Sequence, residues 1–247
     1  MAGTAVSGRL AWQVARLAAI RQETATARTL VFDIPGWPGH LAGQHVDVRL
    51  TAADGYTAQR SYSLAAPAEG GRVELTVQRV PGGEVSEHLT GPYAIGDPVE
   101  IRGPIGGWFV WRPADRAPVL LVAGGAGIVP LMAMVRARRA AGSRALFRLV
   151  YSLRTPDELY YADELRKPYA GLDITYVYTR EMPEGRAGIP RRLDVATLNS
   201  AAWPADFEAT SYICGPTGFV ETAADILLSL GRDPRSIRTE RFGPSRD

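Results

Sequence analysis

The chain of 247 residues contains a single cysteine, Cys214. A disulfide framework is therefore impossible, and so is an iron–sulfur cluster fused into this chain, because such a cluster takes several cysteine thiolates. Long apolar runs are also missing, since the longest apolar stretch, around residues 117–135, is broken by GGAG and a proline. The N-terminus shows no charged start followed by an apolar run. We therefore expect a cytoplasmic protein with no secretory signal and no membrane span.

A strong charge of either sign is absent as well. The chain has 28 basic and 26 acidic residues, a formal net charge of +2, which gives no support for a nucleic-acid partner. His40, His45 and His88 lack metal-ligand spacing, so we expect no metal site. The basic run at 136–144, RARRAAGSR, is interpreted as a solvated helix face, with docking of an acidic redox partner as the alternative.

The residues that are present divide the chain into two halves. Period-2 segments between Gly and Pro breaks predict a small antiparallel barrel or sandwich in the first half, with strands at 29–34, 45–50, 72–80 and 98–103. After a change of character near 111–117, apolar strands alternate with helices, which predicts a parallel, doubly wound sheet. The predicted domains are 1–112 and 113–247. The expected strands of the second half are 119–123, 146–152, 173–179, 211–214 and 237–242, with helices from Pro130 to about Ala141, from Thr155, and near 217–230.

A glycine-rich turn, VAGGAGIVP, joins the first apolar strand of the second half to a helix. In an open parallel sheet the crevice beyond the strand ends binds ligands, and free N–H groups at a helix start suit phosphate. Gly124, Gly125 and Gly127 allow close approach of a pyrophosphate, and Pro130 suits the first helical turn. A tight turn without any ligand is the alternative, because Pro130 replaces the third glycine of the usual dinucleotide pattern.

Five short motifs occur in a fixed order: RSYS (60–63), GGEVSEHL (82–89), GGAGIVP (124–130), CGP (214–216) and TERFGP (239–244). Together they resemble the ferredoxin–NADP reductase superfamily, and more closely its oxygenase-reductase and flavohaemoglobin-reductase branch. The resemblance implies a six-stranded antiparallel FAD-binding barrel followed by an NAD(P)-binding α/β domain. FAD rather than FMN rests on this resemblance alone.

The resemblance also implies residue roles. Arg60 would pair with the flavin pyrophosphate, Tyr62 would lie along the ring or ribityl chain, and Ser63 would hydrogen-bond near flavin N5. Phe242 would cover the flavin face. The implied catalytic residues are Ser63, Cys214, Glu240 and Phe242, with Cys214 as a positioning residue. The implied cofactor-binding residues are Arg60, Ser61, Tyr62, Ser63, Gln78, Val80, Gly82, Gly83, Val85, Ser86, Gly124, Gly125, Gly127, Pro130, Ser152, Arg154, Arg180, Cys214, Gly215, Pro216 and Phe242.

The choice of nicotinamide coenzyme depends on the ends of two strands. An acidic residue after the second strand of such a domain indicates NAD, whereas arginine suits the 2′-phosphate of NADP. Ser152 and Arg154 stand at that position, and Arg180 follows the next strand. The acids of TPDE (155–158) are interpreted as a helix capping box. NADPH is therefore predicted in preference to NADH, with solvated loop arginines as the alternative.

The expected function is electron transfer from NADPH through FAD to a separate protein, either a ferredoxin or an oxygenase component. A diffusible acceptor, such as free flavin or a quinone, is the second hypothesis. A catalytically silent flavin-binding subunit of a larger complex is the third. The sequence leaves the oligomeric state open.

Overall fold

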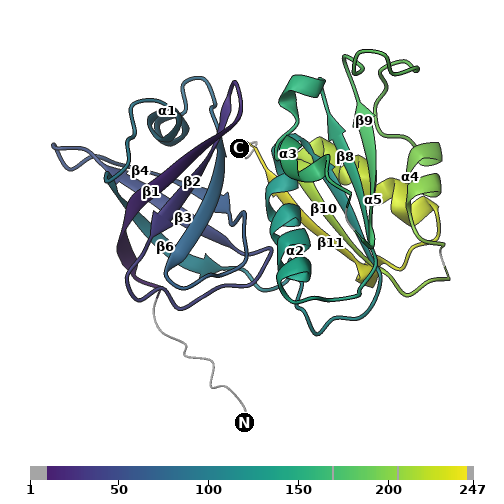
Figure 1. The fold of residues 1–247 in the computed structure, drawn as a ribbon, viewed down its shortest axis with the longest axis horizontal. Helices are drawn as coiled ribbons and strands as arrows, with labels where there is room; N and C mark the ends of the chain where they lie inside the picture. Colours follow the sequence, from purple (N-terminus) through teal and green to yellow (C-terminus); the bar gives the residue numbers. More distant parts are fainter. Residues whose placement is uncertain (1–9, 169, 205, 244–247) are drawn as a thin grey trace, which may run out of the picture.

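The computed structural model describes residues 10–168, 170–204 and 206–243. An N-terminal barrel and a C-terminal α/β domain lie side by side (Figure 1). The last antiparallel strand ends at Ile105 and the first parallel strand begins at Val119. The predicted limits 1–112 and 113–247 stay a prediction, and Pro244 of the last motif lies outside the described residues, as do residues 1–9.

Six antiparallel strands form the barrel in the order β4-β3-β6-β1-β2-β5. It closes where Leu64, directly after β4, bridges to Leu75 of β5. Alternate side chains point into the core, among them Val46 and Val48, both fully buried. The bounds are β1 (Trp12–Thr24), β2 (Ala27–Asp33), β3 (His45–Thr51), β4 (Thr57–Ser63), β5 (Arg72–Gln78), α1 (Glu84–Thr90) and β6 (Pro98–Ile105).

The second half contains a five-stranded parallel sheet in the order β11-β10-β7-β8-β9. Its central strand is buried on both faces, because Leu121 packs in the cluster of α2 and Val122 in that of α5. This arrangement is doubly wound, as predicted. The bounds are β7 (Val119–Gly124), α2 (Ile128–Ala140), β8 (Phe147–Leu153), α3 (Ala162–Leu165), β9 (Leu172–Tyr178), α4 (Val195–Ala201), β10 (Thr210–Pro216), α5 (Thr217–Ser229) and β11 (Ile237–Phe242), with 3₁₀ turns at Gly125–Gly127, Pro156–Glu158 and Pro234–Ser236.

An apolar interface joins the two domains. Ala42 and Ala65 of the barrel belong to the same buried cluster as Met132 and other residues of α2. Trp111, in the connection between the domains, is buried in that cluster and lies edge-on to Phe147 at a centroid distance of 5.3 Å. Packing therefore restricts how the domains can move relative to each other.

The first strand was not predicted from the sequence. β1 is 13 residues long, but its pairing with β2 shifts register between Leu17 and Ala19 and again between Gln22 and Thr24. Each shift moves the following side chains to the opposite face, so the period-2 pattern is lost in the sequence.

The predicted helix at Thr155 was wrong. Only a 3₁₀ turn forms there, at Pro156–Glu158, and the Thr155 side chain makes no capping hydrogen bond. The carboxylate of Glu158 lies 3.6 Å from Arg154 instead. α3 starts only after Tyr161, whose left-handed backbone (φ 55°) interrupts the helical path.

Helix length bears on the membrane question. In the three described ranges the longest helices, α2 and α5, have 13 residues each, and no helix is long and apolar enough to cross a membrane.

Candidate active site

The predicted catalytic residues meet where the two domains touch. Ser63 is the last residue of β4, and its hydroxyl donates a hydrogen bond of 3.1 Å to Oε1 of Glu240 in β11. Burial raises the pKa of Glu240 to about 7, and the Ser63 hydroxyl offsets part of that effect. A carboxyl group that changes its charge near neutral pH therefore faces the end of the RSYS strand.

Cys214 lies next to this contact. In the parallel pairing of β10 with its neighbours, Cys214 is opposite Glu240 on one side and Ala123 on the other. The side chain is fully buried. Burial, and secondly the negative charge of Glu240, raise the pKa of the thiol well above its ordinary value. A protonated thiol is a poor nucleophile, which agrees with a positioning role for Cys214.

The glycine-rich turn is shaped by close backbone contacts. A Cβ on Gly127 would lie 2.0 Å from the carbonyl oxygen of Cys214, so only glycine lets this turn approach β10. A Cβ on Gly124 would lie 2.6 Å from the ring of Phe219. Gly125 adopts φ 53°, and the space around its missing Cβ is open. The glycines therefore have packing reasons of their own, and the open position at Gly125 leaves room beside the turn.

Other predicted nucleotide-binding residues lie with Cys214 at the carboxyl ends of the parallel strands. Ser152 pairs with Gly124 across β8 and β7, and Phe242 pairs with Pro216 across β11 and β10. Phe242 is 36% exposed. Gly215 follows Cys214 on β10 at φ 156°, and Pro130 is the third residue of α2, which begins two residues earlier than predicted.

The two arginines predicted to bind the 2′-phosphate are neighbours. The backbone N–H of Arg180 donates to the carbonyl oxygen of Arg154 at 2.9 Å, which places the ends of β8 and β9 together. Both side chains are exposed. The contact of Arg154 with Glu158 joins two solvent-exposed groups and costs little to break.

On the barrel side, Arg60 and Tyr62 are two residues apart on β4 and so share a face. Arg60 is exposed and donates to the carbonyl oxygen of Gln59, and within the described part of the chain it makes no ion pair. Tyr62 packs partly against the barrel core, where burial raises its pKa to about 12. Ser61 points the other way and donates to Asp47 at 2.7 Å.

The loop between β5 and α1 carries the remaining predicted residues. The hydroxyl of Ser86 accepts a hydrogen bond from the N–H of Val80 at 3.1 Å and donates to Gly83. Gly83 caps α1 without a side-chain bond, and a Cβ there would lie 2.7 Å from the Ser86 oxygen. Ser86 therefore shapes the loop from within. The side chain of Val85 is buried in the barrel core, whereas Val80 is exposed, Gly82 has φ 74°, and Gln78 is the last residue of β5.

These features fit two dinucleotides. An exposed arginine with no carboxylate partner among the described residues, on the same strand as a tyrosine and a serine, suits a flavin with its pyrophosphate. An open glycine turn before a 13-residue helix, with two neighbouring arginines nearby, suits a pyridine nucleotide. No group of three metal-binding side chains occurs in the described ranges.

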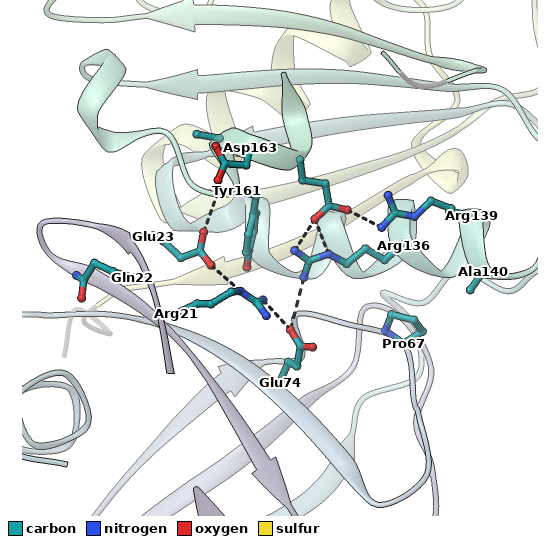
Figure 2. Close-up of a pocket in the computed structure, with 12 residues that line it drawn as sticks. Arg21, Gln22, Glu23, Pro67, Glu74, Arg136, Arg139, Ala140, Tyr161 and Asp163 are labelled. Atoms are coloured by element: carbon teal, nitrogen blue, oxygen red, sulfur yellow. Dashed lines mark hydrogen bonds and ion pairs between the residues drawn. The ribbon is translucent and has the colours of Figure 1, made fainter. Parts of the chain in front are cut away.

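One region was missed by the sequence reasoning. A cavity of about 600 Å³ lies between the domains and is lined by Arg21, Glu23 and Glu74 of the barrel and by Arg136, Tyr161 and Glu164 of the α/β domain (Figure 2). None of its lining residues is a predicted site residue. The interpretation of the run 136–144 as a solvated face was wrong for two arginines. Arg136 packs at the domain interface with a side chain only 12% exposed. Arg138 is buried within the α/β domain, where it donates to the carbonyl oxygen of Ala145. The signal in the sequence was that this run begins on a helix whose preceding residues, 128–135, are all apolar.

The fold and the site together define a two-domain oxidoreductase with one domain for a flavin and one for a nicotinamide coenzyme. The family described as oxidoreductase FAD-binding domain matches residues 15–110, and the family described as oxidoreductase NAD-binding domain matches residues 121–225. The chain belongs to the ferredoxin–NADP reductase superfamily.

Three similar proteins illustrate the relationship. The glycine betaine monooxygenase reductase subunit of Chromohalobacter salexigens is 32% identical over 92% of this chain and 63% of its own length. The crystal structure of the Amycolatopsis cytochrome P450 reductase is 27% identical, with a TM-score of 0.81 over 98% of this chain and 74% of that one. The FAD/NAD-binding domain of nitric oxide dioxygenase from Vibrio cholerae O1 biovar El Tor shares the fold, with 23% identity and a TM-score of 0.82 over 94% and 99% of the two chains. The chain spans about three fifths of the length of the first curated relatives it matches, 59% and 63%.

Proposed function

We propose that the chain is a flavoprotein reductase that takes electrons from NADPH, in preference to NADH, and passes them through FAD to a separate redox protein, a ferredoxin or an oxygenase component. The hydrogen bond between Ser63 and Glu240, beside Cys214, carries this proposal, because it brings the predicted flavin strand and the predicted nicotinamide edge to one point. The name of the relative from Chromohalobacter salexigens, a monooxygenase reductase subunit, supports the choice of partner. In this proposal residues 1–112 bind the flavin and residues 113–247 the coenzyme.

The side chains bind and orient the cofactors. Bound FAD would supply the redox chemistry, by accepting hydride from the nicotinamide and releasing electrons to the acceptor. The Arg60 guanidinium would bind the flavin pyrophosphate, for which its planar fork is suited. Tyr62 would lie along the flavin and Phe242 would cover its ring. The loop from Gln78 to Ser86 would hold the pyrophosphate through its backbone.

Ser63 and Glu240 control one proton. The Ser63 hydroxyl has a single hydrogen, which ionised Glu240 accepts. Protonated Glu240 would instead donate to Ser63 and free the serine hydrogen for another acceptor, such as a bound flavin. Because burial raises the pKa of Glu240 to about 7, this change would occur as the pH falls through neutrality.

The decisive experiment is anaerobic stopped-flow absorbance at the flavin band, with the FAD-loaded protein mixed separately with NADPH and with NADH. Fast bleaching by NADPH, followed by reoxidation with a ferredoxin, is the expected result. Reoxidation that is faster with free flavin or a quinone would replace the protein acceptor by a diffusible one. If neither coenzyme bleaches the bound flavin, the chain is a silent flavin-binding subunit.

The coenzyme preference has its own test. The double variant Arg154→Ala, Arg180→Ala removes both guanidinium groups beside the proposed 2′-phosphate. Loss of charge-assisted hydrogen bonds, each worth about 1.5–3 kcal/mol, raises the KM for NADPH by roughly tenfold or more. The KM for NADH, which has no 2′-phosphate, stays unchanged. Equal changes for both coenzymes would refute the preference.

A further inference from the structure

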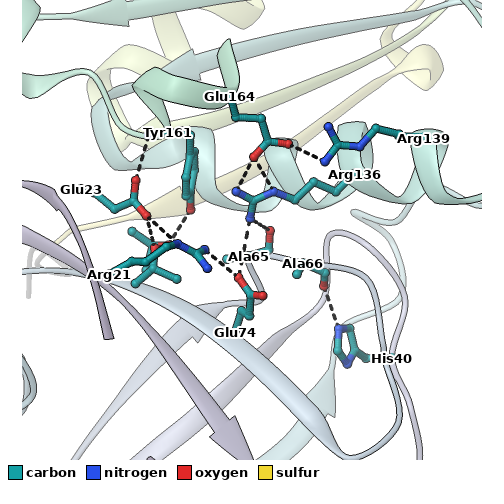
Figure 3. Close-up of polar contacts among 12 residues, drawn as sticks. Arg21, Glu23, His40, Ala65, Ala66, Glu74, Arg136, Arg139, Tyr161 and Glu164 are labelled. Carbon is teal, nitrogen blue, oxygen red and sulfur yellow. Dashed lines mark hydrogen bonds and ion pairs between the residues drawn. The ribbon is translucent and has the colours of Figure 1, made fainter. Parts of the chain in front are cut away.

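A network of buried and half-buried polar groups crosses the domain interface away from the proposed cofactor site. We name it the interdomain latch: Glu23, Thr29, Glu74, Thr76 and the Ala65 carbonyl from the barrel, with Arg136, Tyr161 and Glu164 from the α/β domain. Figure 3 shows its labelled side chains converging from β1, β5, α2, the segment before α3 and α3 itself. Thr29, Thr76 and Tyr161 are each at most 5% exposed.

The first half of the latch is a closed hydrogen-bond circuit. The Thr29 hydroxyl donates to Glu23 at 2.6 Å and therefore accepts from Thr76, which lies 2.8 Å away. Thr76 has then used its own hydrogen, so it accepts from the Tyr161 hydroxyl. The backbone N–H of Tyr161 returns to the other oxygen of Glu23 at 3.0 Å. Every donor in the circuit has one acceptor, and the circuit ends on a carboxylate, which fixes its direction.

The second half of the latch is Arg136. Its guanidinium donates to Glu164 at 2.7 and 3.0 Å and to the carbonyl oxygen of Ala65 at 2.8 Å. The carboxylate of Glu74 lies 3.9 Å from the same group, and the guanidinium is 4.5 Å from the centre of the Tyr161 ring. The side chain is only 12% exposed. A planar fork with several donors makes all of these contacts at once, and lysine has no equivalent geometry.

The latch is connected to both halves of the proposed active site. Ala65 is two residues after Ser63, so Arg136 holds the chain just beyond the end of β4, the strand proposed to bind the flavin. Arg136 is also on α2, the helix that follows the glycine-rich turn. Tyr161 forms a separate tie between the segment after β8 and strand β5. Two ties at different points fix both the distance and the angle between the domains.

Tyr161 adopts a backbone conformation that L-residues disfavour. It is the sole non-glycine residue with positive φ in the described ranges. Such a conformation is unfavourable for a residue with a side chain and persists where the surroundings demand it. Here the conformation directs the N–H to Glu23 and the ring under Arg136.

We propose that Arg136 and Tyr161 are positioning residues for the reductase reaction, which hold the glycine-rich turn at the working distance from Ser63. This inference rests on the proposed function. Neither residue contacts the proposed cofactor site. Their loss is expected to leave both cofactors bound while the nicotinamide no longer meets the flavin in the reactive geometry.

The test compares wild type with Arg136→Lys and Tyr161→Phe, using the full chain loaded with FAD. Tyr161→Phe keeps the ring below Arg136 and removes only the hydroxyl that bonds Thr76. Arg144→Lys is the matched control, because Arg144 is an exposed arginine in the loop that follows α2, outside the latch. We expect the limiting rate of flavin reduction to fall roughly tenfold or more in both latch variants. The dissociation constants of both latch variants for FAD and NADPH should match those of wild type. The control variant should match wild type in its reduction rate as well.

A second readout needs no flavin. Deuterium uptake at the backbone amide of Tyr161, which donates to Glu23, should rise in Arg136→Lys and stay unchanged in Arg144→Lys. If wild type is reduced normally and both latch variants keep its rate, the positioning proposal is wrong and the proposed function stands. If no coenzyme reduces wild type, the proposed function fails. In that case amide exchange alone tests the latch. Unchanged deuterium uptake at Tyr161 in Arg136→Lys would show that Arg136 does not hold the domains together, and the positioning proposal would be wrong.

Discussion

Arg60 and Glu240 carry opposite charges in very different surroundings. Arg60 is exposed on β4 and donates to a neighbouring carbonyl oxygen, so its charge is available to a ligand. Glu240 is half-buried between the domains, and burial brings its pKa to about 7. Strands β4 and β11 therefore present a permanent cation and a carboxyl group that titrates near neutrality.

Replacing Arg60 tests the flavin site. Arg60→Ala removes the guanidinium proposed to bind the pyrophosphate, and a lost charge-assisted hydrogen bond of about 1.5–3 kcal/mol weakens FAD binding roughly 10- to 100-fold. Fluorescence titration of flavin-free protein measures the change. Arg72→Ala is the control, because Arg72 is an exposed barrel arginine that faces Asp33. Equal affinity in the two variants would remove Arg60 from the site.

The titration of Glu240 predicts a pH dependence of stability. Its folded pKa of about 7 lies above the ordinary 4.5, so folding favours the protonated form. That stabilisation is present in full below pH 4.5 and is lost as the pH rises through 7. Glutamine resembles the protonated acid and does not titrate. In the flavin-free protein, Glu240→Gln should therefore melt close to wild type at acidic pH and at a higher temperature than wild type at about pH 8.

The reference for this titration is an exposed glutamate. Glu184→Gln changes a solvated side chain, so its melting curve should follow that of wild type across the whole range. A constant difference in melting temperature between Glu240→Gln and wild type, from acidic to alkaline pH, would contradict the burial argument.

Among the elements, the glycine-rich turn shows most clearly how packing selects residues. Gly127 is needed because β10 passes directly beside it, and Gly124 because the Phe219 ring covers it. These contacts press the start of α2 against the end of β10, where Cys214 lies. The turn would be glycine-rich for packing reasons even without a phosphate, and its ligand role depends on the surrounding residues.

A pair of glycine substitutions separates contact from backbone freedom. Gly127→Ala places a methyl group 2.0 Å from the Cys214 carbonyl oxygen. The forced shift should cost about 1–3 kcal/mol or more, as for other overpacked sites. Gly218→Ala, in the first turn of α5 with no atom near its missing Cβ, should be neutral or stabilising by up to about 1 kcal/mol. Urea unfolding measures both, and similar losses in the two variants would show that the contact between Gly127 and β10 relaxes freely.

Strands and helices differed in how well the sequence predicted them. β3 and β6 were recognisable because one face of each strand is buried and their burial alternates. β7 and β8 were recognisable as apolar runs because both of their faces are buried. β1 was missed because two register shifts scramble its alternation. The prediction of a helix at Thr155 was wrong. It relied on a local capping pattern, and the interdomain contacts of Tyr161 outweigh that pattern.

Across the full chain, the two domains share one apolar cluster and one polar latch. Ala42 and Ala65 pack against α2, and Arg136 and Tyr161 reach back into the barrel. The interface is therefore similar in character to a domain core, with buried polar groups that are paired to one another in the latch.

This interface predicts cooperative unfolding. Because neither domain can unfold without exposing the shared cluster and the charged groups of the latch, we expect a single calorimetric transition for the flavin-free protein. FAD, which binds only the folded state, should raise the temperature of that one transition by mass action. Two resolved peaks, with only one of them shifted by FAD, would show that the domains unfold independently.

The order of the two folds, the family motifs and the residue types at the proposed site could all be predicted from the amino-acid sequence, because they depend on local alternation, turn chemistry and short spacings. Which distant residues meet followed from the folded chain alone: Ser63 with Glu240, Arg136 with Ala65, and Tyr161 with Thr76 and Glu23. The physical reason is burial. An arginine, a tyrosine or a glutamate looks the same in a sequence whether water or another domain surrounds it, and its pKa and hydrogen bonds follow from that surrounding.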